Sequence, residues 1–148
     1  MIALLLAVAA QAVPVTPAPV QPATATPVLG AIGQQKLPAR GCAAYLWSAA
    51  DRHLVAMATA DPAMIRVSVG GRTIDLARSS AGDGPGKLGF ADQAEYRGAD
   101  VTARLTMDIV QQEGLSAGAK VPTGSLQIDR VGQDGIVVPV AGLIGCRA

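Results

Sequence analysis

His53 is the one histidine of this 148-residue chain, and Asp51 lies two residues before it. A histidine oriented by an aspartate activates a serine in many hydrolases. The chain has no Gly-x-Ser-x-Gly elbow to present such a serine, and its carboxylates, Glu95 and Asp100 among them, follow no catalytic or EF-hand spacing. One histidine and two cysteines also leave no transition-metal site of familiar spacing. We therefore expect no catalytic residues, no metal ligands and no enzymatic activity.

Three glycines, Gly84, Gly86 and Gly89, have the Gly-x-Gly-x-x-Gly spacing of a dinucleotide-binding loop, and Asp108 follows at a distance of about 20 residues. This chemistry needs a helix directly after the third glycine, because amide groups at the helix N-terminus bind the pyrophosphate. Residues 101–109 instead alternate like a strand, and no strand–helix–strand unit is visible. The sequence therefore predicts no cofactor.

The same glycines belong to a connection at residues 79–89 (SSAGDGPGKLG) that is long for a small domain. Long loops on rigid β scaffolds often carry binding sites. We interpret this loop as a candidate partner-binding element, and a surface loop without a partner is the alternative. The candidate residues are Ser79, Ser80, Gly82, Asp83, Lys87 and Phe90.

Cys42, a hairpin at Gly70-Gly71, the run Ser79-Ser80-Ala81-Gly82 and Cys146 follow one another in an order that resembles the small exported inhibitors of c-type lysozyme. Those proteins are β-barrels with cysteines near both ends and a Ser-Gly loop after a hairpin. The resemblance implies a loop that enters an enzyme cleft. In this chain, however, Ala81 interrupts the Ser-Gly pair, the aromatic residue after it is displaced to Phe90, and the stretch from Gly114 is longer.

Charge gives no indication of a nucleic-acid or anionic membrane partner. Twelve basic and eleven acidic residues are interspersed, and the net charge is +1. Half of the residues are apolar but only four are aromatic, so the core must consist of Ala, Val, Ile and Leu.

The N-terminal region predicts export. Residues 2–10 form an apolar run that is too short for a membrane span, and Ala10-Gln11-Ala12 has the small-x-small form of a signal-peptide cleavage site. A segment rich in Pro, Ala and Thr follows, which favours an extended spacer. We predict a signal peptide at 1–12, a disordered spacer at 13–40 and a β domain at 41–148. The mature chain would then lie in the periplasm or outside the cell, without a membrane span.

Two cysteines bracket the predicted domain, Cys42 near its start and Cys146 near its end. An even number of cysteines in an exported chain indicates a disulfide, which here would close a loop of about 105 residues.

The folded part has the pattern of an all-β protein. Residues 65–69 and 73–78 alternate around Gly70-Gly71, as in a hairpin, and residues 101–109 alternate strictly. Residues 90–98 are ambiguous between helix and strand, residues 114–124 are expected to be a loop, and the doubly apolar run 136–146 is expected to be a central or well-covered strand. About seven or eight strands at short spacing predict a small antiparallel β-sandwich or barrel.

These features favour an exported, non-catalytic envelope or periplasmic protein with a binding or structural role, whose partner would be an unidentified envelope protein. The alternatives are a small periplasmic enzyme inhibitor that acts through the loop at 79–89, and an enzyme of unrecognised type.

Overall fold

The computed structural model describes residues 14–19, 28–115 and 117–148, so the predicted signal peptide lies outside the described residues. Nine strands are present in the described part of the chain. They are β1 (Leu29–Gly30), β2 (Gly41–Ser48), β3 (Leu54–Thr59), β4 (Met64–Val69), β5 (Arg72–Ala81), β6 (Gln93–Gly98), β7 (Val101–Val110), β8 (Gly118–Arg130) and β9 (Ile136–Arg147). A search of the described residues finds no helix with the length and hydropathy needed to cross a membrane.

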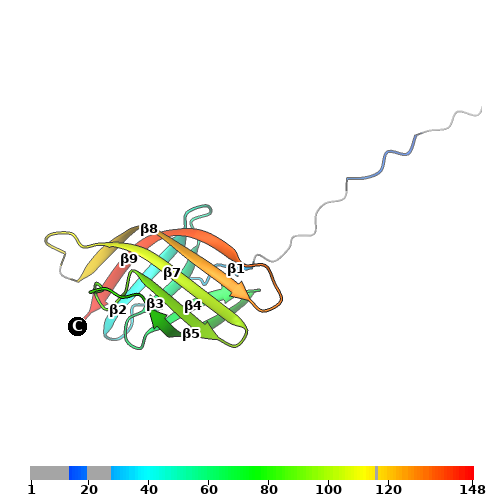
Figure 1. The fold of residues 1–148 in the computed structure, drawn as a ribbon. Helices are drawn as coiled ribbons and strands as arrows, with labels where there is room; N and C mark the ends of the chain where they lie inside the picture. Colours follow the sequence, from blue (N-terminus) through cyan, green and yellow to red (C-terminus); the bar gives the residue numbers. More distant parts are fainter. Residues whose placement is uncertain (1–13, 20–27, 116) are drawn as a thin grey trace, which may run out of the picture.

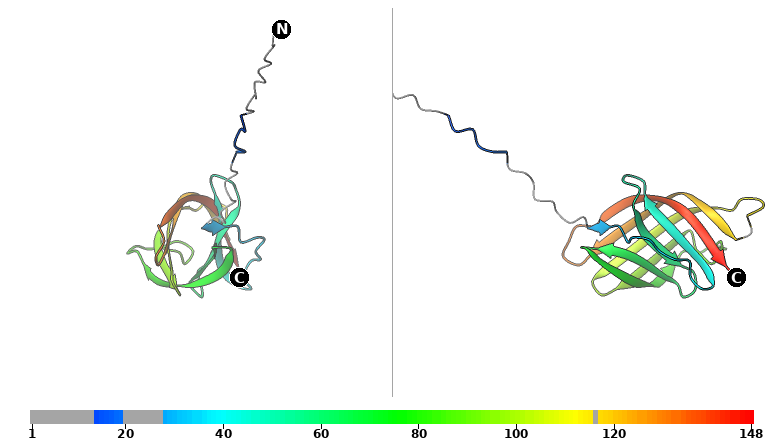
Figure 2. Two further views of the ribbon diagram at one scale, coloured as in Figure 1. Left: turned by 90° about the vertical axis from the view of Figure 1, so that its right-hand side faces the viewer. Right: turned by 180° about the vertical axis from the view of Figure 1, so that it is seen from behind.

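Strands β2 to β9 form a closed antiparallel barrel, in which each strand pairs with the strands before and after it in the sequence (Figure 1). The first and the last of these eight strands close the ring, with Gly41 opposite Arg147 at one end of the pairing and Ser48 opposite Val140 at the other. Figure 2 shows the ring in its left-hand view. The predicted antiparallel all-β fold is confirmed, and of the two predicted architectures it is the barrel.

The strands alternate between the inside and the outside of the barrel. In β7, Val101 and every second residue after it are buried, whereas the residues between them are partly or fully exposed. An eight-stranded barrel is just wide enough for side chains to fill it, and here aliphatic side chains do so. The largest fully buried side chains are Leu46, Ile65, Val67, Leu76, Leu105, Ile109, Val121, Leu126 and Ile128.

Connections alternate between the two ends of the barrel because the strands run up and down in sequence order. One end, which we call the disulfide end, has the Cys42–Cys146 disulfide together with the connections at 60–63, 82–92 and 111–117. The opposite end has β1 and the connections at 49–53, 70–71, 99–100 and 131–135. The predicted disulfide is confirmed. Such bonds are typical of oxidising compartments outside the cytoplasm.

The predicted hairpin at Gly70-Gly71 is present, and both glycines have positive φ, 57° and 79°, as tight hairpin turns require. Residues 93–98 of the ambiguous segment are a strand, β6, which pairs with β5 and β7.

Two expectations about individual segments are wrong. The loop expected from residue 79 begins at Gly82, because β5 continues through a bulge to Ala81. The loop expected at 114–124 is largely strand: β8 begins at Gly118, and its Pro122 lies in an irregularity of the register between Val121 and Gly124. Strand β9 is central, as one of its two expected alternatives required, because it pairs with β2 and β8; its outer face is partly exposed.

Residues 31–37, which we call the strap, connect β1 to β2 along the outside of the barrel. The Ile32 amide donates to the carbonyl of Leu54 (2.8 Å), and the Ile32 side chain is buried. An Arg66 Nη1 atom on β4 donates to Gln35 Oε1 (2.9 Å). The C-terminal part of the segment predicted as a spacer, residues 13–40, therefore contacts the barrel from Leu29 onward.

Candidate functional site

Loop 82–92 at the disulfide end has a firmly held base. The Phe90 side chain is buried against the barrel core, and Lys87 and Phe90 exchange backbone hydrogen bonds of 2.7 and 2.9 Å. Lys87 Nζ donates to the carbonyl of Ile109 (2.6 Å) on β7. Between this base and β5, residues 82–86 are exposed. The loop therefore presents a small-residue tip on a fixed support.

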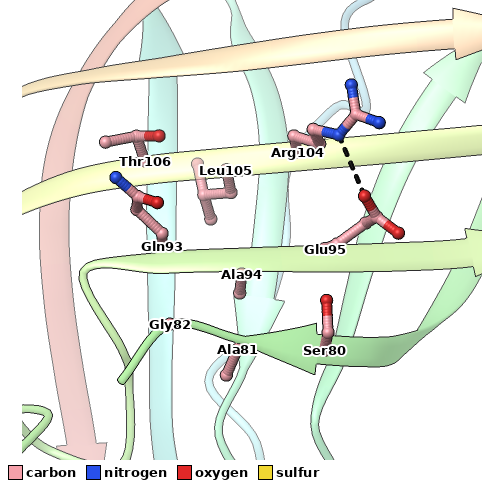
Figure 3. Close-up of a pocket in the computed structure, with 9 residues that line it drawn as sticks. All are labelled: Ser80, Ala81, Gly82, Gln93, Ala94, Glu95, Arg104, Leu105 and Thr106. Atoms are coloured by element: carbon pink, nitrogen blue, oxygen red, sulfur yellow. Dashed lines mark hydrogen bonds and ion pairs between the residues drawn. The ribbon is translucent and has the colours of Figure 1, made fainter. Parts of the chain in front are cut away.

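A groove of about 300 Å³ lies beside this loop on the outer wall of β5, β6 and β7 (Figure 3). Its long polar side chains rise from alternate positions of two strands, Gln93 and Glu95 of β6 and Arg104 and Thr106 of β7. A bulge after Arg78 places Ser80 opposite Glu95, and the Ser80 hydroxyl points toward that carboxylate. The remaining lining residues are Ala81, Gly82, Ala94 and Leu105.

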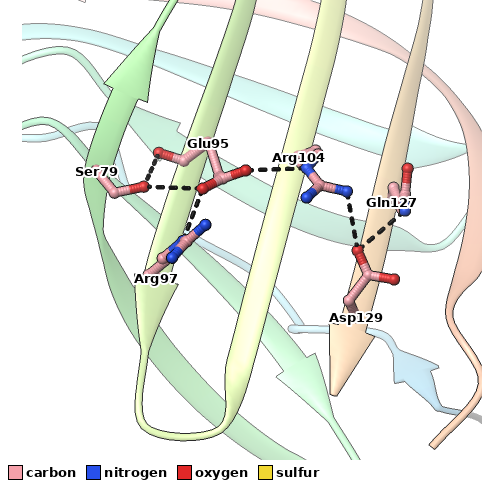
Figure 4. Close-up of polar contacts among 6 residues, drawn as sticks. All are labelled: Ser79, Glu95, Arg97, Arg104, Gln127 and Asp129. Carbon is pink, nitrogen blue, oxygen red and sulfur yellow. Dashed lines mark hydrogen bonds and ion pairs between the residues drawn. The ribbon is translucent and has the colours of Figure 1, made fainter. Parts of the chain in front are cut away.

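Glu95 is the centre of a polar network on this wall (Figure 4). Its carboxylate accepts from Arg97 Nε (2.7 Å) and Arg104 Nε (2.9 Å), and the Ser79 hydroxyl donates to its backbone carbonyl (3.1 Å). Arg104 extends the network to Asp129 on β8, with an Nη1–Oδ2 distance of 3.3 Å. Because Glu95 is 18% exposed and both arginines are more than half exposed, one carboxylate holds two guanidinium groups at the surface.

The hydrogen bond from Arg104, followed by that from Arg97, lowers the pKa of Glu95 below its ordinary value of 4.5. When the pKa of a carboxyl is lower in the folded than in the unfolded state, its ionised form stabilises the folded protein. This stabilisation is fully present at a pH above the unfolded-state pKa, and it is lost as the pH falls through the folded-state pKa. An NMR titration of the Glu95 carboxyl carbon should therefore give a midpoint below 4.5. We expect Arg104→Gln to raise that midpoint, and Arg66→Gln, which removes the separate ion pair with Asp75, to leave it unchanged. A midpoint unaffected by Arg104→Gln would contradict the network.

The six residues predicted for partner binding divide into two groups. Ser79, Ser80, Gly82 and Asp83 lie on the surface at the end of β5 and at the loop tip. Lys87 and Phe90 lie in the base of the loop, where each makes the contacts described above. The loop prediction did not include Gln93, Arg104 and Thr106. These residues could have been found only from the register of β5, β6 and β7, since nothing in their local sequence marks them.

His53 and Asp51 do come together, in the turn between β2 and β3. The His53 amide donates to Asp51 Oδ1 (3.2 Å), and His53 Nδ1 lies 3.8 Å from Asp51 Oδ2. This amide, followed by the Ser48 side chain, lowers the pKa of Asp51. Both ring and carboxylate are about two-thirds exposed, at 67% and 60%. The aspartate thus accepts hydrogen bonds within the turn, in the manner of an Asx turn.

The glycine spacing 84–86–89 lies in the loop just described, and the strand β6 follows it instead of a helix. Gly86 and Gly89 have positive φ, 56° and 85°, which the tight return at Lys87–Phe90 requires. Glu95 and Asp100 each have arginine partners: Asp100 accepts from Arg130 Nε (2.9 Å), whereas Glu95 accepts from Arg97 and Arg104. In the part of the chain that the structure describes, no three His, Cys, Asp or Glu side chains gather as metal ligands would.

Comparisons with known proteins add no relative to this description: no protein-family model, no curated protein and no solved structure matches the chain.

Proposed function

We propose that this chain is an exported, non-catalytic binding protein whose barrel presents loop 82–92 and the adjoining groove to a partner protein of the cell envelope. The observation that carries the proposal is the combination of an exposed loop tip, a buried loop base and a polar groove on one wall. A binding surface that is rigid before it meets its partner loses less conformational entropy on association.

Binding on the outer wall follows from the packing of the barrel. Among the described residues, side chains from all eight barrel strands form one buried cluster, so we place the binding surface on the outside of the barrel. The groove between β5 and β7 and a cavity of about 260 Å³ both include Gly82, so the start of the loop borders two concave surfaces. The second cavity is lined by Asp83 and Asp92, among others.

Export is supported by two independent features. The disulfide requires an oxidising environment to form and persist. The apolar run at residues 2–10 with the small residues after it has the composition of a signal peptide.

A photo-crosslinking amino acid at position 83 tests the proposal, because Asp83 is exposed at the loop tip. The matched control is position 134, since Asp134 is also exposed but lies in the 131–135 connection at the opposite end of the barrel. After irradiation of intact cells, we expect a discrete crosslinked protein from position 83 and none from position 134. The same products from both positions, or none from either, would refute partner binding through this loop.

A second candidate function is inhibition of an enzyme by insertion of the loop into its cleft. The narrowness of the tip favours it, because residues 82–86 are Gly, Asp, Gly, Pro and Gly. The order of cysteines, hairpin and serine–glycine run that resembles lysozyme inhibitors suggests the enzyme to test. The purified protein should then inhibit a c-type lysozyme, and Gly84→Trp should abolish inhibition without unfolding the barrel, because a Cβ at Gly84 meets no atom within 4 Å. Absence of inhibition by the unaltered protein would eliminate this candidate.

A further inference from the structure

A second groove, of about 500 Å³, lies on the opposite wall of the barrel, over β2, β8 and β9 near the disulfide end. Loop 111–117 and the strap residue Leu37 contribute to its rim. None of its lining residues, all of them in the described part of the chain, is charged, in contrast to the ion pairs of the β5–β7 wall. The lining residues are Leu37, Tyr45, Gly114, Leu115, Ala117, Gly118, Ala119, Leu143, Ile144 and Gly145.

Small residues and exposed leucines together form the groove. Gly118 and Gly145 line the groove without side chains. The Leu37 side chain lies over Gly145, with its Cδ2 atom 3.2 Å from the position that a Cβ of residue 145 would occupy. Leu143 projects from the outer face of β9 and is 53% exposed, and Leu115 is 50% exposed. Single apolar side chains scattered over a protein surface are normal. Exposed leucines that gather around a concave surface are instead typical of a ligand site.

Tyr45 adds a polar group to this apolar wall. Its hydroxyl oxygen is buried and has no hydrogen-bond partner among the described residues. Burial raises the pKa of Tyr45, and the nearby guanidinium of Arg147 partly opposes this rise. Tyr45 is opposite Leu143 in the β2–β9 pairing, and it lines the groove. A buried hydroxyl without a partner is costly, so a ligand that accepts its hydrogen bond is favoured there.

Two cations flank the groove without forming ion pairs among the described residues. Arg147 ends β9, two residues beyond the lining residue Gly145, and Lys120 is the partner of Leu143 across the β8–β9 pairing. Both side chains are exposed. Loop 111–117 carries one carboxylate, Glu113, against these two cations. The groove thus combines an apolar surface, a hydrogen-bond donor and an excess of positive charge at its border.

We propose that this groove binds a single-chain anionic amphiphile, with the aliphatic chain against Leu37, Leu115 and Leu143 and the acidic head group at the Tyr45 hydroxyl and Arg147. The groove volume lies within the range of about 300–1,000 Å³ that is usual for small-molecule sites. This site is independent of the partner-binding loop, which lies on the other wall.

Oleate is the probe for the first test, added to the full chain at concentrations below its aggregation limit and followed through the amide NMR signals of Gly118, Leu143 and Gly145. We expect saturable shifts confined to the groove. Leu143→Gln should weaken binding at least tenfold, and Tyr45→Phe, which removes only the hydroxyl, should weaken it severalfold. The matched control is Val137→Gln, because Val137 is also exposed on the outer face of β9 (63%) but does not line the groove. Circular dichroism confirms that each variant folds.

Four results would overturn the proposal. The first is the absence of saturable binding. The second is an equal loss of affinity in Leu143→Gln and Val137→Gln, which would indicate unspecific adsorption to β9. The third is equal affinity for oleate and for the neutral monoacylglycerol of the same chain, which would remove the role of Tyr45 and Arg147. A second copy of the chain as occupant would appear in sedimentation as a dimer that Leu143→Gln dissociates and oleate does not affect, and it would likewise refute the amphiphile.

Discussion

Loss of the Cys42–Cys146 disulfide is expected to lower the free energy of unfolding by about 2–5 kcal/mol. The bond joins residues separated by 104 positions, so it restricts nearly the whole folded chain in the unfolded state. It also connects register partners of β2 and β9, the one pairing of the barrel that is not between sequence neighbours. Without the bond, the unfolded chain must bring its two most distant strands together before the barrel can close, and the entropy cost of doing so rises with loop length.

Thermal and denaturant unfolding of the double variant Cys42→Ser/Cys146→Ser provides the measurement. For a domain of this size, the expected loss corresponds to a fall in Tm of roughly 10–25 °C. Because both cysteines are also packed against the core, the variant alone does not isolate the covalent bond. The wild-type protein in strong reductant does, and its stability should fall close to that of the variant. A wild-type Tm that is the same with and without reductant would show that the bond contributes nothing to stability.

Local features of the fold could be predicted from the sequence. The hairpin at Gly70-Gly71 depends only on two glycines between alternating runs, and β7 depends only on its own period of two. The disulfide followed from the number of cysteines and their positions at the two ends of the domain. Each of these inferences uses residues that are close in sequence or a property that does not depend on register.

Features that depend on which strands become neighbours could not be predicted. The groove on the β5–β7 wall arises because a bulge in β5 aligns Ser80 with Glu95, and no local pattern reveals that register. Strand β1 and the strap lie within a segment whose prolines favoured a spacer, yet Leu29 and Ile32 find apolar sites on the barrel. The doubly apolar pattern of β9 indicated a central or well-covered strand. The strand is central, but only the barrel's closure shows that its outer face borders a groove.

Gly142→Ala is expected to destabilise the barrel by about 3 kcal/mol. Gly142 lies between β2 and β8, opposite Leu46 on one side and Val121 on the other. A Cβ at this position would overlap the carbonyl oxygen of Tyr45 and stand 3.2 Å from the Cα of Leu46. Both are backbone atoms, so no rotamer change can relieve the overlap, and β2 must move away from β9.

This clash opposes a favourable effect. In a strand, alanine in place of glycine gains about 0.5–1 kcal/mol because the unfolded chain loses conformational freedom. The clash is larger, so the sign of the change at Gly142 is unfavourable. At Gly84 in loop 82–92, a Cβ would meet no atom within 4 Å and φ is not positive, so Gly84→Ala should be neutral or slightly stabilising. Urea unfolding of the two variants against the wild type measures both effects. Equal stabilities of Gly142→Ala and Gly84→Ala would contradict the prediction. They would mean that β2 and β9 can separate at Gly142 without a loss of stability.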